Sequence, residues 1–251
     1  MIQHQRFVIL SLPRTGSTYL VDYLDAVPGV KCLSEVFNPE AVLLRHHKPT
    51  DPALTDKVVR DNDPLAFLRR LEQDVGACDW FGVKLFPSHS NKLLHYFCSS
   101  RQWKKIFLWR DNLLEQYVSF LLASAQYGRE SWERVADEAR LTVPLGALLD
   151  DLHAIEKNYI EIEDALFLSE HEDVFTLEYD DLAQPATMEQ MLRFLGVDEA
   201  EIGRRVASAK ATAESHALTF ERGPRATARI ANYPDVCAAL SHTRYRRWLA
   251  A

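Results

Sequence analysis

The chain has 251 residues, of which 47% are hydrophobic, and a formal net charge of -7 at pH 7. This length and composition suffice for one sizeable buried core, so we expect a single domain over residues 1–251. The negative charge argues against a nucleic-acid-binding protein, because binding to a phosphate backbone relies on a surplus of Lys and Arg.

Cysteine spacing and apolar runs restrict the class of protein further. The four cysteines lie far apart without a CxxC pair, which predicts reduced thiols rather than a zinc site or a disulfide framework. The opening residues, MIQHQRFVILSL, hold too short an apolar run for a signal peptide. The sequence also contains no stretch of about 18 apolar residues, the length needed to span a bilayer. We therefore expect a cytoplasmic protein without a membrane span.

Hydrophobic periodicity predicts strands that alternate with helices. In chain order these are a strand over 6–12, a helix over 17–27, an extended segment over 29–37, a helix over 64–75, a strand over 80–86, a helix over 90–99, a strand over 104–109, helices over 112–128 and 144–168, a strand over 173–179, and helices over 187–197, 199–208 and 234–241. This alternation predicts an α/β fold with a central parallel sheet covered by helices on both faces. Residues 38–79 contain four prolines and little regular pattern, and we interpret them as an insertion that forms a lid or binds an acceptor.

The segment LSLPRTGSTYL, residues 10–20, joins the first predicted strand to the first predicted helix. Ligands of parallel α/β sheets bind outside the carboxyl ends of the strands. Backbone N–H groups at the helix start, the hydroxyls of Thr15, Ser17 and Thr18, and the guanidinium of Arg14 would form a pocket for a tetrahedral oxyanion. The Walker pattern GxxxxGK[ST] is absent, which argues against an ordinary ATPase or GTPase. By itself, the segment is equally typical of a simple turn and helix N-cap.

A second segment, FLWRDNLLEQYVSF, supplies another cation at the end of a strand. Arg110 follows the strand over 104–109, and Ser119 lies nine residues further, about two and a half turns along the next helix. Arg110 and Ser119 could therefore hold one phosphate group.

Together, LPRTGSTYL and WRDNLLEQYVS resemble the nucleotide-binding signatures of sulfotransferases that use 3′-phosphoadenosine-5′-phosphosulfate (PAPS), especially bacterial members of the carbohydrate and glycolipid type. A third segment, LEYDDLAQPATMEQMLRFLGV, is similar to a largely structural part of the family and follows in the same order, and RIANYPDVCAAL is weakly similar to a segment near the end of bacterial members. The resemblance implies a P-loop-like three-layer fold. It also implies transfer of a sulfuryl group from PAPS to a hydroxyl or amine of a carbohydrate, glycolipid or small secondary metabolite, without a metal.

The resemblance further implies roles for individual residues. The first loop would hold the 5′-phosphosulfate, with Arg14 at the bridging and sulfuryl oxygens, while Arg110 and Ser119 would fix the 3′-phosphate. The expected nucleotide-binding set comprises Arg14, Thr15, Gly16, Ser17, Thr18, Tyr19, Arg110, Ser119, Arg222 and Gly223. Arg222 and Gly223 match a basic loop of cytosolic members only in part, and a solvated basic stretch is an equally good interpretation.

The acceptor requires a general base, for which there are two candidates. Glu35, in CLSEVF, occupies a place that resembles the glutamate proposed as base in bacterial glycolipid sulfotransferases, and partial burial would raise its pKa toward neutrality. His89, in KLFPSHS, lies three residues beyond the position of the catalytic histidine of cytosolic members, so Glu35 leads, and a helix-capping or core histidine is the commoner interpretation of His89. Lys84 is either a snorkelling lysine or a second sulfuryl contact. Trp80 or Phe86 could stack on adenine, although core packing is the default interpretation for an aromatic residue on a strand.

Two other functions stay open at the level of the sequence. One is a nucleoside-phosphate kinase of related fold, which would need Mg²⁺ ligands and a conventional lysine loop. The other is a catalytically silent nucleotide-binding protein that keeps the anion pocket without a base. The sequence indicates neither the acceptor nor whether the chain forms a homodimer.

Overall fold

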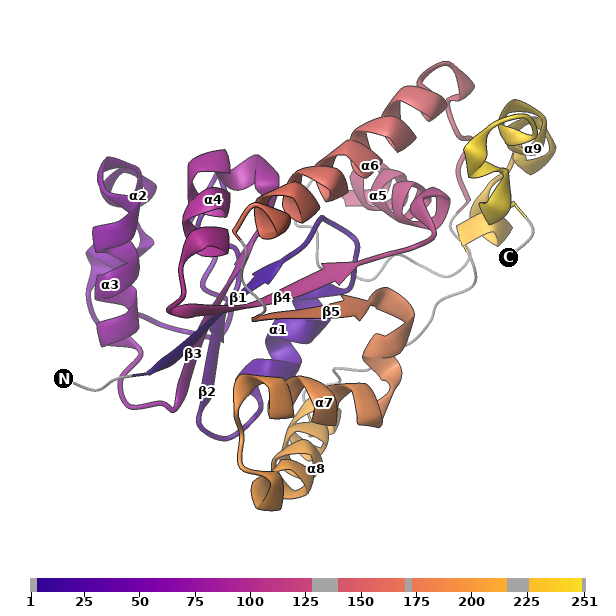
Figure 1. Cartoon of the computed structure of the whole chain (residues 1–251). Helices are drawn as coiled ribbons and strands as arrows, with labels where there is room; N and C mark the ends of the chain where they lie inside the picture. The colour runs from indigo at the N-terminus through magenta and orange to yellow at the C-terminus, as the bar shows by residue number, and fades with distance from the viewer. Residues whose placement is uncertain (1–3, 128–139, 170–172, 216–225, 250–251) are drawn as a thin grey trace.

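A computed structural model describes residues 4–127, 140–169, 173–215 and 226–249 of the chain. Its centre is a five-stranded sheet in the order β2-β3-β1-β4-β5, in which all neighbours pair in parallel (Figure 1). The strands are β1 (Gln5–Leu10), β2 (Val30–Leu33), β3 (Trp80–Leu85), β4 (Trp103–Trp109) and β5 (Val174–Glu178). The predicted α/β fold with a parallel sheet is therefore confirmed.

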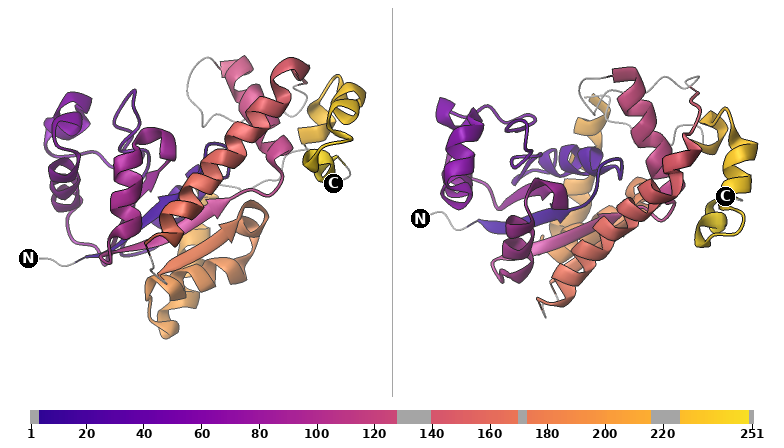
Figure 2. Two further views of the ribbon diagram at one scale, coloured as in Figure 1. Left: turned by 45° about the horizontal axis from the view of Figure 1, so that its top comes forward. Right: turned by 90° about the horizontal axis from the view of Figure 1, so that it is seen from above.

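Helices cover both faces of the sheet, which makes three layers (Figures 1 and 2). They are α1 (Ser17–Asp25), α2 (Lys57–Asn62), α3 (Pro64–Asp74), α4 (Asn91–Ser99), α5 (Leu113–Tyr127), α6 (Leu145–Phe167), α7 (Pro185–Leu195), α8 (Glu199–Ser215) and α9 (Tyr233–Leu240). The side chains of β1 point alternately to the two faces of the sheet. Val8 and Leu10 pack with α3 to α6, while Phe7 and Ile9 pack with α1, α7 and α8. Each face of the sheet thus has its own hydrophobic cluster.

Three predicted elements differ from those observed. The extended segment over 29–37 is a strand only in β2, and the helix expected over 199–208 continues to Ser215. Helix α2 lies inside the segment 38–79, where only one helix is predicted. Its N-cap is Asp56, whose side chain accepts the backbone N–H of Val58, and Asp63 caps α3 in the same way through Ala66.

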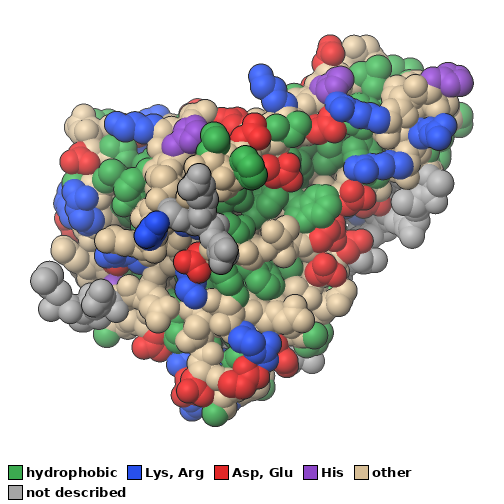
Figure 3. All heavy atoms as spheres, viewed as in Figure 1, with side chains coloured by type: hydrophobic (Ala, Val, Ile, Leu, Met, Phe, Trp, Pro, Cys, Tyr) green, Lys and Arg blue, Asp and Glu red, His purple; other side chains and the backbone are tan. Residues whose placement is uncertain are grey.

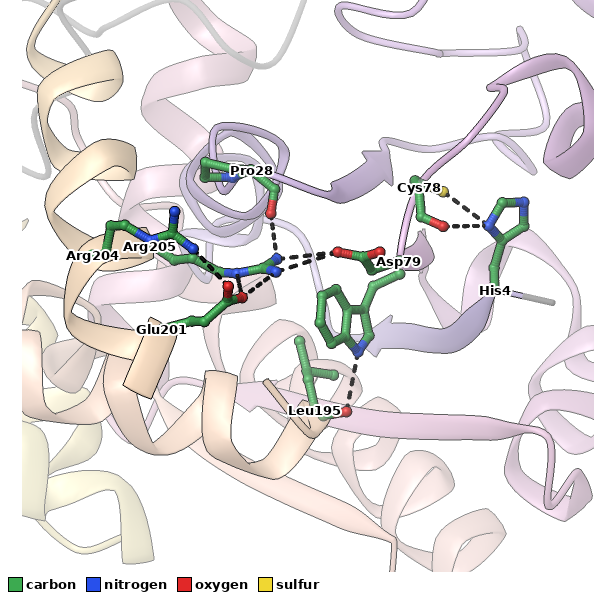
Figure 4. Close-up of polar contacts among 9 residues, drawn as sticks. His4, Pro28, Cys78, Asp79, Leu195, Glu201, Arg204 and Arg205 are labelled. Carbon is green, nitrogen blue, oxygen red and sulfur yellow. Dashed lines mark hydrogen bonds and ion pairs between the residues drawn. The ribbon is translucent and has the colours of Figure 1, made fainter. Parts of the chain in front are cut away.

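Arg205 of α8 lies at the amino ends of β2 and β3, at the end of the sheet opposite the loop after β1. Arg205 donates to the carbonyl of Pro28 at 2.5 Å and lies 3.3 Å from the carboxylate of Asp79 (Figure 4). The same guanidinium covers the ring of Trp80, and the indole N–H of Trp80 donates to the carbonyl of Leu195. Trp80 is buried at the start of β3, which confirms core packing, the default interpretation of this aromatic residue, and places it at the end of the sheet opposite the loop after β1.

Among the described residues, none of the helices is both long and apolar enough to cross a bilayer. Figure 3 shows apolar side chains interspersed with acidic ones on the face that carries α6. The exposed apolar residues of α6 and its C-terminal end are Leu145, Leu149, Ile160, Phe167 and Leu168.

Gly82 in β3 allows close packing between strands. A Cβ atom at this position would lie 2.1 Å from the ring of Phe7, which is fully buried. We expect Gly82→Ala to lower the free energy of unfolding by about 1–3 kcal/mol, as for other overpacked cores. Denaturant unfolding measures the loss. The control is Gly203→Ala on α8, where a Cβ meets nothing within 4 Å, so that this variant should be as stable as the wild type or more so.

Candidate functional site

The loop after β1 holds its main chain in a strained conformation at the carboxyl edge of the sheet. Arg14 has φ 67° and Gly16 has φ 77°, so both lie in the left-handed region. This region is uncommon for a residue other than glycine, and such strain collects at functional sites. Gly16 is the N-cap residue of α1, and the first N–H groups of that helix, from Ser17 onward, have no acceptor within the helix. The loop therefore presents backbone donors beside a cation.

Arg110 reaches the same place from the neighbouring strand. Strands β1 and β4 are paired, and Arg110 directly follows β4. Its Nη1 donates to the carbonyl oxygen of Arg14 at 3.3 Å, and Nε of Arg14 donates to Oγ of Ser119 at 3.0 Å. The structure thus brings together Arg14, Arg110 and Ser119, which the sequence assigns to two ends of one nucleotide.

The guanidinium of Arg110 is held on several sides. Its Nη2 donates to Glu115 at 2.6 Å, and the guanidinium carbon lies 4.0 Å from the ring centroid of Tyr179. Its Nε is buried without a hydrogen-bond partner among the described residues. Burial and the charge of Arg110 lower the pKa of Arg14, because two guanidinium groups repel each other in a poorly solvated place. An anion bound here would supply both an acceptor for Nε and a counter-charge.

The side chains of the loop divide into two groups. Thr15 is fully buried and its hydroxyl donates to the carbonyl of Leu12 at 2.8 Å, so this hydroxyl closes the loop. The expectation that it faces an oxyanion is corrected, and only the backbone N–H of Thr15 stays a candidate donor. Thr18, in contrast, is half-buried and lies 3.4 Å from Nζ of Lys84. Tyr19 lies in the first turn of α1 with its ring 6.2 Å from that of Tyr23.

Glu35 lies at the centre of a second polar cluster, which Lys84 connects to the loop. Its Oε1 is 3.0 Å from Nζ of Lys84, and its Oε2 accepts from Nδ2 of Asn38 at 2.8 Å and lies 3.5 Å from Nε2 of His89. The side chain of Glu35 is 12% exposed, whereas those of Lys84 and His89 are 1% and 2% exposed. The carboxylate is therefore the most accessible of these three groups.

The pKa expected for Glu35 from the sequence is wrong. Burial does favour the neutral acid, but the hydrogen bonds from His89 and Asn38 and the charge of Lys84 outweigh it, and they lower the pKa of Glu35 to about 2. Burial lowers the pKa of Lys84, and Glu35 opposes that effect. We therefore treat the pair as a carboxylate and an ammonium that stabilise each other.

The turn that carries Glu35 is fixed by hydrogen bonds to its carbonyl groups. The carbonyl of Glu35 accepts the backbone N–H of Asn38, and Arg60 of α2 donates through Nη1 to the carbonyls of Val36, Asn38 and Ala41 at 3.0, 2.6 and 3.2 Å. Arg60 is only 3% exposed. These bonds satisfy main-chain acceptors of the turn, which lies outside the sheet.

The histidines after this turn bind carboxylates. Asp22 of α1 accepts two hydrogen bonds from Arg45, at 2.8 and 2.7 Å, and lies 3.1 Å from Nε2 of His46. Nε2 of His47 lies 2.8 Å from Asp74. The segment is thereby fastened to α1 and α3.

Two of the predicted nucleotide-binding residues, Arg222 and Gly223, lie outside the described residues.

Other contacts of the candidate site have little signal in the sequence. Asn38 and Glu115 were not predicted, although each follows its partner closely in the sequence, Asn38 after Glu35 and Glu115 after Arg110. This short spacing is the only sequence signal for them. The pairing of Lys84 with Glu35 joins β3 to the turn after β2 and has no local signal.

Comparison with known proteins gives matches only among solved structures. No family model matches the chain, and no match is found among curated proteins. A sulfotransferase from Alicyclobacillus acidocaldarius is 16% identical over 85% of this chain and 97% of that one, with a TM-score of 0.47. The sulfotransferase domain from the curacin biosynthetic pathway is 14% identical over 96% and 98%, with a TM-score of 0.47, and sulfotransferase STF1 from Mycobacterium tuberculosis H37Rv is 14% identical over 92% and 77%, with a TM-score of 0.48.

All three are described as sulfotransferases. The identities are low and the TM-scores modest, so a functional argument has to come from the residues of this chain.

Proposed function

We propose that this protein is a sulfotransferase that moves the sulfuryl group of PAPS to a hydroxyl or amine of an acceptor. The observation that carries the proposal is the convergence of Arg14, Arg110 and Ser119 at one edge of the sheet, beside the ionised carboxylate of Glu35. The first three form an anion site with two cations, and Glu35 adds a proton acceptor. An anion site beside a base is what a group-transfer enzyme needs.

The donor nucleotide fits the observed cations. When bound, PAPS supplies the activated sulfuryl group, whose transfer resembles phosphoryl transfer in passing through a loose in-line transition state. Arg14 and the first-turn N–H groups of α1 would hold the 5′-phosphosulfate, and Arg110 with Ser119 would hold the 3′-phosphate. The unpartnered Nε of Arg110 supports this assignment, because a buried donor of this kind calls for an acceptor.

Glu35 is our choice as general base. Nδ1 of His89 accepts the backbone N–H of Phe86 at 3.3 Å, so the proton of the neutral ring lies on Nε2, which faces Glu35. A neutral His89 in this tautomer offers no lone pair to an acceptor, and its side chain is almost fully buried. We therefore assign His89 to orienting the carboxylate and Glu35 to receiving the proton.

The low pKa of Glu35 is compatible with this role. In a loose transition state the bond from the acceptor oxygen to sulfur is only slightly formed, and the proton of the acceptor becomes strongly acidic only as this bond completes, so proton transfer comes late and a weak base suffices. Lys84 lies between Glu35 and Thr18, which would keep a positive charge close to the transferring group. We further propose that residues 38–79 contact the acceptor, because the turn with Glu35 leads directly into them.

A thermal-shift titration tests the donor site. Adenosine 3′,5′-bisphosphate, the nucleotide product, should raise the melting temperature by about 5–10 °C at roughly one hundred times its Kd, because it binds only the folded protein. ATP with Mg²⁺ should have a smaller effect. The opposite order would favour a kinase, and no shift with either nucleotide would contradict the proposal. A shift with adenosine bisphosphate but no turnover across an acceptor screen with radiolabelled PAPS would favour a silent binding protein.

A further inference from the structure

Two buried side chains connect the main chain of the anion loop to that of Arg110. Gln116 of α5 and Tyr159 of α6 are 3% and 7% exposed. The hydroxyl of Tyr159 accepts the backbone N–H of Arg110 at 3.1 Å and donates to Oε1 of Gln116 at 2.8 Å. Nε2 of Gln116 then donates to the carbonyl of Pro13 at 2.8 Å. The chain of hydrogen bonds runs from one half of the anion site to the other without entering it.

The two side chains are well satisfied and therefore stiff. A buried hydroxyl or amide without a partner is costly, and hydrogen bonds in a chain strengthen one another in a poorly solvated interior. Burial raises the pKa of Tyr159, so its hydroxyl keeps the proton that it donates to Gln116. The ring of Tyr159 also packs edge-on against Phe107, at 6.2 Å between centroids. Rotation of either side chain would break at least two contacts.

Nε of Arg14 donates directly to Oγ of Ser119 at 3.0 Å, but the direct hydrogen bond between the two arginines is weaker. Nη1 of Arg110 reaches the carbonyl of Arg14 only at 3.3 Å, which is beyond the usual N–H···O range. The two backbone bonds at Pro13 and Arg110 are shorter and lie immediately next to, or at, the two arginines. Beyond the pairing of β1 with β4, the buried pair is therefore the shorter hydrogen-bonded connection between the backbones next to Arg14 and at Arg110.

We propose that Gln116 and Tyr159 are positioning residues that set the separation of Arg14 and Arg110, and so match the site to a nucleotide with anionic groups at both its 5′ and 3′ positions. The inference rests on the proposed function, since it assumes that one ligand bridges both arginines. A nucleotide with a 5′-phosphate alone would contact one half and would be insensitive to the separation.

Tyr159→Phe tests the proposal. The variant keeps the ring that packs on Phe107 and removes the hydroxyl that joins Arg110 to Gln116. We expect the affinity for adenosine 3′,5′-bisphosphate to fall about 10-fold and that for adenosine 5′-monophosphate to fall less than about 3-fold, since only the first ligand pays for a changed separation. Isothermal titration calorimetry measures both values.

Tyr117→Phe is the matched control. Tyr117 lies on α5, is equally buried, and donates its hydroxyl to Asp151 of α6 at 2.7 Å, but its bond does not lead to the anion site. It should lose stability as Tyr159→Phe does, with the ratio of the two nucleotide affinities unchanged. Gln116→Met removes the hydrogen bond to the carbonyl of Pro13 and should change the ratio of the two affinities in the same direction as Tyr159→Phe. It provides an independent test if Tyr159→Phe does not fold. In the variant with both Tyr159→Phe and Gln116→Met, the loss of affinity for adenosine 3′,5′-bisphosphate should be no larger than the larger of the two single losses.

The outcomes separate this inference from the function on which it rests. A wild type that binds neither nucleotide contradicts the proposed function. A wild type that prefers the bisphosphate, with variants at Tyr159 and Gln116 that keep the same preference, overturns the positioning role alone. An equal loss for both nucleotides also overturns it, because this loss indicates general damage to the site.

Discussion

Replacement of Glu35 by glutamine is expected to lower kcat for sulfuryl transfer by about 10²-fold, the lower end of the usual contribution of a general base, because the proton is transferred late and a weak base suffices. Glutamine keeps the length of the side chain and an oxygen that can accept from Lys84 or Asn38, but it cannot take the proton of the acceptor. Nucleotide affinity should stay close to that of the wild type, because Arg14 and Arg110 hold the nucleotide. Steady-state kinetics with an acceptor that the wild type uses, together with calorimetric titration of adenosine bisphosphate, measure the two effects.

Asp22→Asn is a suitable control for this variant. Asp22 is another buried carboxylate, paired with Arg45, and its side chain is 2% exposed. Its replacement should reduce stability as the loss of any buried ion-pair partner does, with little change in kcat. A similar fall in kcat for both variants would show that Glu35 acts through stability and would contradict its role as base.

A comparison of wild type with Glu35→Gln also tests the lowered pKa of Glu35, through the pH dependence of the free energy of unfolding. The pKa is about 2 in the folded protein and 4.5 as the ordinary value. A lowered pKa stabilises the fold above the unfolded value, and this contribution is lost as the pH falls from 4.5 to about 2. The difference in unfolding free energy between wild type and Glu35→Gln should therefore be constant near neutrality and shrink below about pH 4.5, which urea unfolding at several pH values measures.

Arg110→Ala should weaken the binding of adenosine 3′,5′-bisphosphate by about 10–150-fold, which corresponds to the loss of one or two hydrogen bonds from a charged group. The effect on adenosine 5′-monophosphate should be much smaller, because Arg110 is assigned to the 3′-phosphate. Calorimetry with both nucleotides measures the difference between the two losses.

Arg247→Ala is the control for Arg110→Ala. Arg247 lies close by, where it pairs with Asp111 at 3.3 Å, but its side chain is 64% exposed. An exposed pair contributes little to stability or to local structure, so both affinities should stay unchanged. If Arg110→Ala left the preference for the bisphosphate intact, the 3′-phosphate would have to be bound elsewhere.

The fold could be predicted largely from local patterns. Apolar runs such as RFVILSL mark buried strands, and helical spacing between them predicts a parallel sheet. Helix α2 was missed because it is short, although Asp56 and Asp63 carry ordinary N-cap signals. The position of Trp80 was within reach of the sequence, since the first residue of a strand lies at its amino end and cannot meet a ligand at the carboxyl end.

The site was predictable in position but not in its electrostatics. Strand ends place Arg14 and Arg110 together, since β1 and β4 are neighbours. The pKa of Glu35 was misjudged because its partners Lys84 and His89 come from a different strand and the turn after it. Burial alone predicts a raised pKa, and only the structure reveals the cation and the hydrogen bonds that reverse it.

The contact between Arg60 and the turn of Glu35 limits how this protein could be re-engineered. The segment proposed to recognise the acceptor also contains Arg60, whose guanidinium binds three carbonyls next to Glu35. Exchange of residues 38–79 for the corresponding segment of another protein would therefore remove the bonds that fix the turn of Glu35 together with the segment proposed to bind the acceptor. A chimera should keep Arg60 and the turn from Glu35 to Ala41, and should vary only exposed residues between Ala41 and Arg60.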